Sequence, residues 1–328
     1  TTGSGGAEKN VANDVSITTI ASGITLQDDG GSGGLASNYT LVGGTHQVDI
    51  TKAPVTIDLT RQYDGTTNAS SNATDSSTTE TYNGLVGSET LTLTGQGSVS
   101  NKNVSGGTQA VTLGTLAIGN QSGATAASGG LASNYNFTSA TLTINQKVLN
   151  SSSSRIYDST TAAAASDITL TNQVTGESLQ LSNAAATSSA NVGSYSISNL
   201  SGISISDEAG ANASSGALAA NYTLTGGTHN FTINPKSVNI AGTRQYDGTT
   251  NIPAADISNI TDTVNSEVLT MSGGLGTTSS ANVGAYSLVN TSQGTLTLGD
   301  GPAGVNQGLA SNYTLTDHLP DYTSYPCR

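Results

Sequence analysis

The most distinctive residue strings of this chain return about every ninety residues, and this interval limits the possible folds more than any other feature. Gly-Leu-Ala-Ser-Asn-Tyr occurs at 34–39, 130–135 and 308–313, with the variant Ala-Leu-Ala-Ala-Asn-Tyr at 217–222. Between these strings, Arg-x-Tyr-Asp-Gly/Ser-Thr-Thr occurs at 61–67, 155–161 and 244–250. Self-similarity at this spacing is typical of small domains in tandem. The chain is therefore interpreted first as an array.

Aligning the strings divides the chain into four segments, here called repeats 1 to 4, at 1–51, 52–146, 147–235 and 236–328. Repeat 1 begins in mid-repeat, because Lys-Asn-Val at 9–11 corresponds to Lys-Asn-Val at 102–104. We expect it to supply only the second half of a unit, which cannot pair all of its strand edges. Neighbouring repeats of a longer chain, or strands from another copy, would then complete it.

Within each repeat, apolar residues alternate with Ser and Thr, as in Val-Thr-Ile-Asp-Leu-Thr at 55–60, Leu-Thr-Leu-Thr at 91–94 and Thr-Leu-Thr-Leu at 295–298. Gly, Asn and Asp clusters separate these stretches, a pattern typical of half-buried antiparallel strands joined by turns. No stretch shows a sustained helical period. The pattern predicts an all-β fold: a tandem array of Ig-like antiparallel β-sandwich repeats of about 90 residues, joined end to end.

Composition limits the function classes. The net charge is −13 with nine Lys and Arg residues, which argues against a nucleic-acid partner because phosphate binding needs clustered cations. Cys327 is the single cysteine, so we expect no internal disulfide and no Cys-x-x-Cys site. No apolar run approaches the ~18 residues of a membrane span, so no membrane insertion is expected. No motif predicts a cofactor, a metal or catalytic residues.

The repeated strings, together with Asn-Val steps such as 191–192 and 282–283, resemble the YDG and MBG repeats of filamentous-haemagglutinin-like surface exoproteins of Gram-negative bacteria. Two departures are Ser159 in place of glycine, and 107–110 in place of a Gly-x-Tyr-Ser string. The resemblance implies a secreted, repetitive stalk or adhesive fibre exported by a two-partner system. It implies no catalysis, and as an analogy at fold level it does not establish function.

The repeated aromatic, carboxylate and amide residues have two interpretations. Tyr and Asp beside an Arg could form a ligand site, but a turn in which Asp accepts local backbone donors and Gly takes a positive φ is more common. Recurrence in every repeat favours the structural role, with Arg61, Arg155 and Arg244 as semi-exposed ion pairs. The residues assigned this role are Tyr63, Asp64, Tyr157, Asp158, Tyr246, Asp247, Asn38, Tyr39, Asn134, Tyr135, Asn221, Tyr222, Asn312 and Tyr313.

A lysine stands at each junction between repeats, which raises the hypothesis of an isopeptide cross-link. A desolvated lysine amine could attack an Asn side chain while a buried carboxylate moves protons. The alternative is a charged, solvated lysine that discourages edge pairing. The candidates are Lys52, Lys147 and Lys236, with Glu89, Glu177 and Glu267 and with Asn134, Asn221 and Asn312. A mass lower by about 17 Da per bond would reveal the link.

Another recurring position lies before each Leu-Ala-x-Asn-Tyr string, at Asp28, Asn120, Asp207 and Asp300. A calcium site needs six or more oxygen ligands, whereas each loop offers one or two carboxylates. A solvated turn is the favoured interpretation.

These observations predict a non-catalytic structural subunit or stalk of an extracellular bacterial surface fibre. Its expected partners are other copies of itself, which could complete repeat 1 by strand complementation, or neighbouring repeats. The alternative is an adhesin module on the cell surface that binds surface glycans or a host matrix through variable loops such as 68–81.

Overall fold

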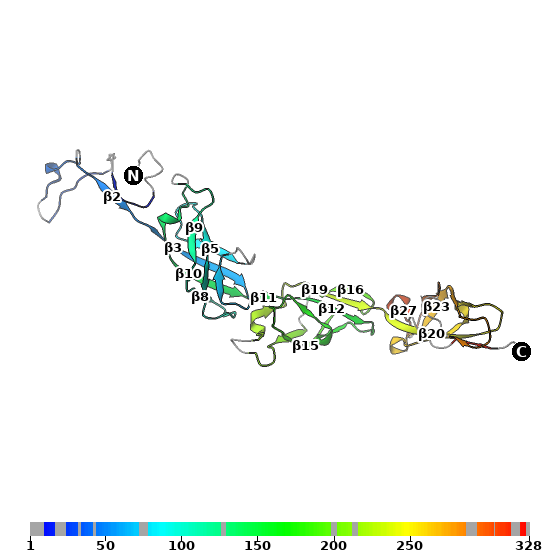
Figure 1. Ribbon diagram of the computed structural model, residues 1–328. Coiled ribbons are helices and arrows are strands. Elements are labelled where there is room, and N and C mark those ends of the chain that lie inside the picture. The colour runs from blue at the N-terminus through cyan, green and yellow to red at the C-terminus, as the bar shows by residue number, and fades with distance from the viewer. Residues whose placement is uncertain are drawn as a thin grey trace. The chain divides into compact units, whose positions relative to one another are not determined.

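The computed structural model describes residues 10–16, 24–31, 34–41, 44–71, 78–125, 129–197, 202–211, 216–286, 294–304, 306–315 and 322–325. It forms two compact units, Thr1–Lys147 and Val148–Arg328, which are described separately. Both are built of strands and short 3₁₀ turns, so the chain is all-β with sandwich-like sheets, as predicted (Figure 1). Among the described residues, the model contains no helix with the length and apolarity needed to cross a bilayer.

The first unit contains repeats 1 and 2. The elements of repeat 1 are β1 (Ala12–Ser16), η1 (Ala36–Asn38) and β2 (Gln47–Ile50). Those of repeat 2 are β3 (Ala53–Gln62), β4 (Asn68–Ser70), β5 (Thr79–Asn83), β6 (Leu91–Thr94), β7 (Gln96–Ser98), β8 (Thr108–Ala110), β9 (Ala117–Asn120), η2 (Ala132–Asn134) and β10 (Tyr135–Asn145).

The second unit contains repeats 3 and 4, preceded by β11 (Lys147–Val148) at the boundary. Repeat 3 has β12 (Asn150–Ile156), β13 (Ala162–Ala164), η3 (Ala165–Asp167), β14 (Leu170–Thr171), β15 (Gln180–Ala186), β16 (Gly193–Ser196), β17 (Ile203–Ser206), η4 (Ala219–Asn221), β18 (Tyr222–Thr223) and β19 (His229–Asn234). Repeat 4 has β20 (Lys236–Gln245), β21 (Asn251–Pro253), η5 (Ala254–Asp256), β22 (Ile257–Thr261), η6 (Val264–Ser266), β23 (Leu269–Gly273), β24 (Leu275–Thr277), β25 (Ala285–Tyr286), β26 (Thr297–Asp300), η8 (Ala310–Asn312), β27 (Tyr313–Leu315) and β28 (Tyr322–Tyr325).

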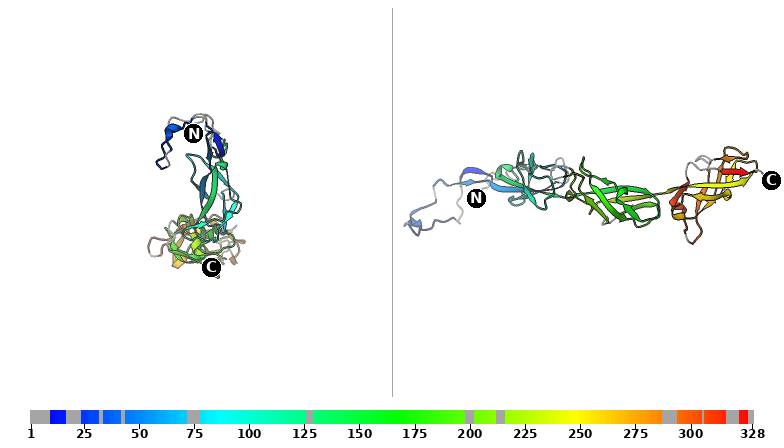
Figure 2. Two further views of the ribbon diagram at one scale, coloured as in Figure 1. Left: turned by 90° about the vertical axis from the view of Figure 1, so that its left-hand side faces the viewer. Right: turned by 90° about the horizontal axis from the view of Figure 1, so that it is seen from below.

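Each of repeats 2 to 4 contains the same main sheet. Its strand order is β5-β3-β10-β8 in repeat 2, β14-β12-β19-β16 in repeat 3 and β22-β20-β28-β25 in repeat 4, where β27 also pairs with β20 (Figures 1 and 2). The remaining pairs, β4–β7 and β6–β9, β13-β15-β17, and β21–β24 and β23–β26, make the second layer. The described strands of repeat 1 form only the β1–β2 pair.

In repeats 2 to 4 the first and last strands pair in parallel, in β3–β10, in β12–β19 and in β20 with β27 and β28, whereas the flanking pairs β10–β8 and β16–β19 are antiparallel. Val55 lies opposite Phe137, and Ser153 lies opposite Phe231. The alternation of apolar and polar residues does not predict this parallel pairing, because it gives no information on strand direction. A parallel pair needs a long crossover, which here is the rest of the repeat. The last strand therefore ends where the next repeat begins: Pro235 alone separates β19 from β20.

The core follows the predicted alternation. In β3, Val55, Ile57 and Leu59 are buried and pack between the layers, and the neighbouring Leu142 of β10 is also fully buried. In the second unit one hydrophobic cluster contains residues of both repeats, including Phe231 and Ile233 from repeat 3 and Leu269 from repeat 4. Burial of apolar side chains therefore holds repeats 3 and 4 together as well as filling each sandwich.

Candidate functional site: the interface between consecutive repeats

The Arg-x-Tyr-Asp string forms a tight turn, here called the Tyr-Asp turn (61–67, 155–161 and 244–250). Asp64 Oδ1 accepts hydrogen bonds from the Thr66 backbone N–H at 2.8 Å and from its hydroxyl at 3.0 Å. Asp158 and Asp247 make the same bonds in their repeats. The next residue has a left-handed φ, +80° at Gly65 but also +62° at Ser159. The turn therefore tolerates the departure from glycine noted in the sequence.

The arginine of each turn is buried, which corrects the expectation of a semi-exposed pair. Only 3%, 9% and 8% of the side chains of Arg61, Arg155 and Arg244 are exposed, although their Asp partners, 2.5–2.7 Å away, are 34–50% exposed. The guanidinium also donates to a threonine carbonyl of the turn, such as that of Thr66 at 2.8 Å. Local carbonyls thus allow the charge to be buried, and the arginine fixes the turn.

In repeat 4 the turn itself lowers the pKa of its Asp. Hydrogen bonding from the backbone of Thr249 lowers the pKa of Asp247, with a smaller contribution from the positive charge of Arg244. Charge and local donors act in the same direction here. This carboxylate is therefore committed to local structure.

Each Leu-Ala-x-Asn-Tyr string begins with a 3₁₀ turn, and the recurring Asp or Asn caps it. The side-chain oxygen of Asp28, Asn120, Asp207 and Asp300 accepts the backbone N–H of the first alanine, at 2.6, 2.9, 2.8 and 2.7 Å. Because neutral Asn120 makes the same bond as the three carboxylates, the bond needs no charge. Within the described residues no cluster of three or more His, Cys, Asp or Glu side chains exists that could hold a metal ion.

We expect Asp300→Asn to leave the stability of the second unit nearly unchanged, because Asn120 already caps the same turn in repeat 2. Asp300→Ala, in contrast, leaves the Ala310 N–H without this acceptor and costs about 1 kcal/mol, a typical value for a lost cap. Denaturant unfolding with and without calcium measures both variants. A large loss on Asp300→Asn, or stabilisation by calcium, would contradict the capping role.

The tyrosine of the same string anchors a second loop, Val-x-x-Glu (86–89, 174–177 and 264–267). The Tyr135 hydroxyl donates to the Glu89 carboxylate at 2.7 Å and accepts the Val86 N–H at 3.1 Å. Tyr222 and Tyr313 repeat this arrangement with Glu177 and Val174, and with Glu267 and Val264. These tyrosines are at most 5% exposed, whereas Tyr39 of repeat 1, where the loop is missing from the sequence, is 70% exposed.

Tyr157 of repeat 3 enters this arrangement in repeat 4. Its hydroxyl donates to the other oxygen of Glu267 at 2.9 Å, and its ring meets the Tyr313 ring edge to face, with centroids 5.4 Å apart at 77°. The Asn265 side chain donates to the Ser159 hydroxyl at 2.7 Å. One carboxylate thus accepts hydroxyls from two repeats, and the Tyr-Asp turn meets the Leu-Ala-x-Asn-Tyr turn of the next repeat.

The asparagine of the Leu-Ala-x-Asn-Tyr turn makes a second contact across this interface. Asn312, 1% exposed, accepts the Val192 N–H at 2.8 Å and donates to the Asn191 side chain at 3.0 Å. In the first unit, Asn134 makes the same pair of bonds to Val11 and Asn10 of repeat 1. Tyr195 holds the Asn-Val loop in place, since its hydroxyl donates to the Asn191 carbonyl at 2.6 Å. The three repeated motifs therefore converge on one interface.

A comparison with known families agrees with this arrangement. The model of the YDG domain matches residues 45–144 and 138–230, which together span more than half of the 328 residues. The chain belongs to the YDG domain family. No curated protein matches it. Both matches begin before the predicted starts of repeats 2 and 3, so the YDG unit includes part of the last strand of the repeat ahead.

The buried tyrosines of the interface between repeats 3 and 4 make the stability of this interface sensitive to alkaline pH. Burial raises the pKa of Tyr157 to about 12, helped by the hydrogen bond to Glu267 and by its negative charge. Burial also raises the pKa of Tyr313, and again Glu267 adds to the effect, while the Val264 N–H opposes it. Both phenols are therefore held neutral by their surroundings.

We expect the second unit to keep its full tyrosine contribution to stability below pH 10 and to lose it as pH rises through about 12. The sign follows because the unfolded chain releases these protons first, near pH 10, so that ionisation favours unfolding. Denaturant unfolding at several pH values, with ultraviolet absorbance to follow tyrosinate, measures this. A stability that stays constant from pH 9 to 12 would contradict it.

The three lysines do not occupy one equivalent position in the YDG repeats. Lys236 lies opposite Tyr313 in the parallel pair, whereas Ala53, not Lys52, lies opposite Tyr135. Counted back from the turn arginine, Lys147 and Lys236 share a register from which Lys52 is displaced by one residue. Asn312 and the Glu267 carboxylate are engaged by the neighbouring repeat as described above. The cross-link stays a prediction for intact mass to test.

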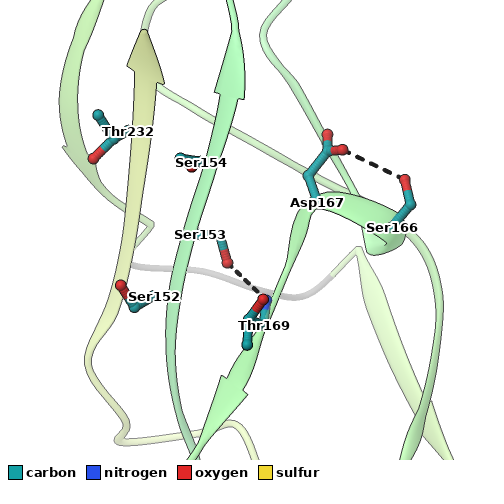
Figure 3. Close-up of a pocket in the computed structure, with 7 residues that line it drawn as sticks. All are labelled: Ser152, Ser153, Ser154, Ser166, Asp167, Thr169 and Thr232. Carbon is teal, nitrogen blue, oxygen red and sulfur yellow. Dashed lines mark hydrogen bonds between the residues drawn. The ribbon is translucent and has the colours of Figure 1, made fainter.

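Repeat 3 also carries a polar hollow beside β12 and β19. A pocket of about 380 Å³ is lined by Ser152, Ser153, Ser154, Ser166, Asp167, Thr169 and Thr232 (Figure 3). Ser153 Oγ accepts the Thr169 N–H at 2.9 Å. Ser152 and Ser154 lie on β12 beside Thr232 of β19. Sequence reasoning missed this hollow because the serine run looks like any other Ser-rich stretch.

Proposed function

We propose that this chain is a structural segment of an extracellular bacterial surface fibre, in which YDG repeats act as non-catalytic spacers. The observation that carries the proposal is the convergence of the three repeated motifs on the interface between repeats. In the interface between repeats 3 and 4, residues of the repeated motifs thus serve to join two copies. Secretion and a surface location follow from the resemblance to filamentous-haemagglutinin-like exoproteins and remain part of the proposal.

The parallel pairing of first and last strands supports a load-bearing role. A pull on the two ends of a repeat acts along β12 and β19, so that it shears the hydrogen bonds between them. These bonds then share the load and break together, whereas bonds at the end of a hairpin open one after another. The same geometry in β3 and β10 extends over ten paired positions, with one bulge.

Stretching single molecules of the full chain tests this proposal. We expect a series of discrete unfolding events, each releasing roughly 300 Å of chain, the extended length of about 90 residues. Gradual extension at low force, without discrete events, would contradict a load-bearing stalk. As a control, a residue outside the paired strands can be altered: Gly107→Ala should leave the forces unchanged, because a side chain there meets nothing within 4 Å and its φ is not left-handed.

A related proposal is self-assembly through the incomplete repeat 1. Its Leu35 is 50% and its Tyr39 70% exposed, as expected for a half sandwich without its partner strands. The missing part is the half that carries a first strand, so strands of that type from another copy would complete it. Sedimentation over a range of concentrations tests this, since growth into filaments supports assembly and a stable monomer at every concentration opposes it.

The second candidate function is an adhesin, and the hydroxyl-lined hollow of repeat 3 favours it. Serine and threonine hydroxyls with one carboxylate, Asp167, suit hydrogen bonding to a sugar. The variable stretch 68–81 is a further candidate: its ends belong to β4 and β5, and residues 72–77 lie outside the described structure. Glycan-array binding that is lost on Ser154→Leu would support this function.

A further inference from the structure

The C-terminal repeat presents an exposed copy of the surface that repeat 3 buries against repeat 4. Tyr246 occupies the position of Tyr157 in its turn, but 45% of it is exposed compared with 5% of Tyr157. Val283 occupies the position of Val192, which packs against the shared cluster, yet Val283 is 48% exposed. We call Tyr246, the Tyr-Asp turn around it, Asn282 and Val283 the terminal face.

The terminal face already has the conformation that the matching residues of repeat 3 adopt in their interface with repeat 4. Tyr286 donates to the Asn282 carbonyl at 2.9 Å, as Tyr195 does to Asn191 at 2.6 Å. Ser280 Oγ accepts the Asn282 N–H at 3.1 Å, the distance also found at the matching bond in repeat 3.

The turn beside this loop is fixed in the same way. Arg244 contacts Asp247 at 2.7 Å, and Asp247 accepts the Thr249 N–H, as in the turn around Tyr157. Docking therefore costs little ordering of these residues.

We propose that the terminal face is a docking surface for a further YDG-type repeat, which would present a Glu carboxylate, a Tyr ring and an Asn carboxamide. In the interface between repeats 3 and 4, Glu267, Tyr313 and Asn312 supply these groups. The carboxylate would accept the Tyr246 hydroxyl, the ring would cover its edge, and the carboxamide would accept the Val283 N–H. In the docking repeat these Glu, Tyr and Asn groups must be accessible, as they are in a repeat that is not already in contact with a preceding repeat.

A second copy of this chain fits the face less well. In that copy the corresponding half of repeat 2 is partly covered by repeat 1, because Asn134 is already hydrogen-bonded to Asn10 and Val11. Val86 of that repeat remains 60% exposed, since the sequence of repeat 1 carries no Tyr-Asp turn to cover it. A second copy would have to displace repeat 1 before both contacts could form.

The strand register shows where a further repeat can be joined. Gln245 lies opposite Tyr325 as Ile156 lies opposite Asn234, and a proline follows in both cases, Pro326 and Pro235. A chain of residues 1–326 followed by a second copy of 236–328 therefore keeps the spacing of the interface between repeats 3 and 4. The appended copy carries its own Glu267, Tyr313 and Asn312.

Hydroxyl-radical footprinting read by mass spectrometry tests the proposal on the full and extended chains. We expect the labelling of Tyr246 to fall about ninefold in the extended chain, the ratio of the exposed fractions of Tyr246 and Tyr157, 45% and 5%. The Tyr246 of the appended copy, which then has the exposed position, should be labelled instead. Glu267→Ala in the appended copy should restore labelling of Tyr246, with Tyr157 as the internal protected control.

Three results would overturn the proposal. Tyr246 labelling could stay unchanged in the extended chain although the appended core is protected. Protection could persist in the Glu267→Ala variant, which would indicate nonspecific shielding. Protection of Tyr246 in the original chain that grows with protein concentration would assign the face to a second copy.

This inference deepens the proposed spacer function without depending on the force measurement. Footprinting reports whether repeats dock, whereas stretching reports whether they bear load. If the repeats dock but unfold at low force, the docking inference stands and the load-bearing stalk is contradicted. If the repeats resist force but Tyr246 stays exposed in the extended chain, the stalk stands and the docking inference is contradicted.

Discussion

Replacement of Tyr157 by alanine is expected to destabilise the second unit by about 3–5 kcal/mol, the usual cost of removing a buried aromatic side chain. The ring is 5% exposed, contacts Tyr313 edge to face, and donates its hydroxyl to Glu267. All of these contacts with repeat 4 are lost at once. We therefore expect the unfolding of repeats 3 and 4, cooperative in the wild type through their shared cluster, to separate into two transitions.

Tyr246→Ala is the matched control for this variant. It changes the same position of the same turn, but in a repeat where the tyrosine is 45% exposed, so its cost should stay near 1 kcal/mol or less. Calorimetry of the wild type and of Tyr157→Ala, each with and without repeat 4, together with Tyr246→Ala in the full chain, distinguishes coupling from local damage. Equal losses for both variants, or a single transition after Tyr157→Ala, would contradict a role in joining the repeats.

Replacement of Glu267 by alanine should cost about 3–6 kcal/mol, because hydrogen bonds to a charged group contribute about 1.5–3 kcal/mol each and two are lost. Both phenol groups, those of Tyr157 and Tyr313, lose their acceptor in a buried setting. Removing an acceptor is more damaging than its net contribution because the donors stay desolvated. Glu267→Gln should recover part of the loss, since its amide oxygen still accepts one hydroxyl.

Glu80→Ala provides the comparison for this second variant. Glu80 also accepts a tyrosine hydroxyl, that of Tyr82 at 2.7 Å, but within β5 of repeat 2 and from one residue only. We expect it to cost about 1.5–3 kcal/mol, the contribution of one such bond, and to leave the second unit unaffected. Urea unfolding monitored in each unit measures both effects. A Glu267→Ala loss no greater than that of Glu80→Ala would contradict the shared-acceptor role.

The strands could largely be predicted from the sequence, because alternation of apolar residues with Ser and Thr reports which face is buried. The stretch 91–94 is β6, and 55–60 lies within β3. The stretch 295–298 was shifted, since β26 is Thr297–Asp300. Thr fits both faces of a strand, so the ends of such short strands are poorly marked.

The interface could not be predicted in the same way. Tyr157 and Glu267 lie 110 positions apart in different repeats, and alignment of repeats compares a residue with its own copies, not with its contacts in the next one. The burial of Arg61 was missed for a similar reason, because the turn carbonyls that, with Asp64, make it tolerable are not visible in the sequence. One usable signal was present: the Tyr-Asp turn, the Val-x-x-Glu loop and the Asn-Tyr string occur together in each of repeats 2 to 4.

The single proline between β19 and β20 has a consequence for how such chains can change length. Side chains alternate between faces along both strands, with Ile233 buried before Pro235 and Val238 and Ile240 buried after it. One added residue at this point would turn Val238 and Ile240 toward solvent. Insertions and deletions are therefore tolerated in the surface loops but not at this proline. The alternation of buried and exposed positions in one repeat fixes the alternation in the next.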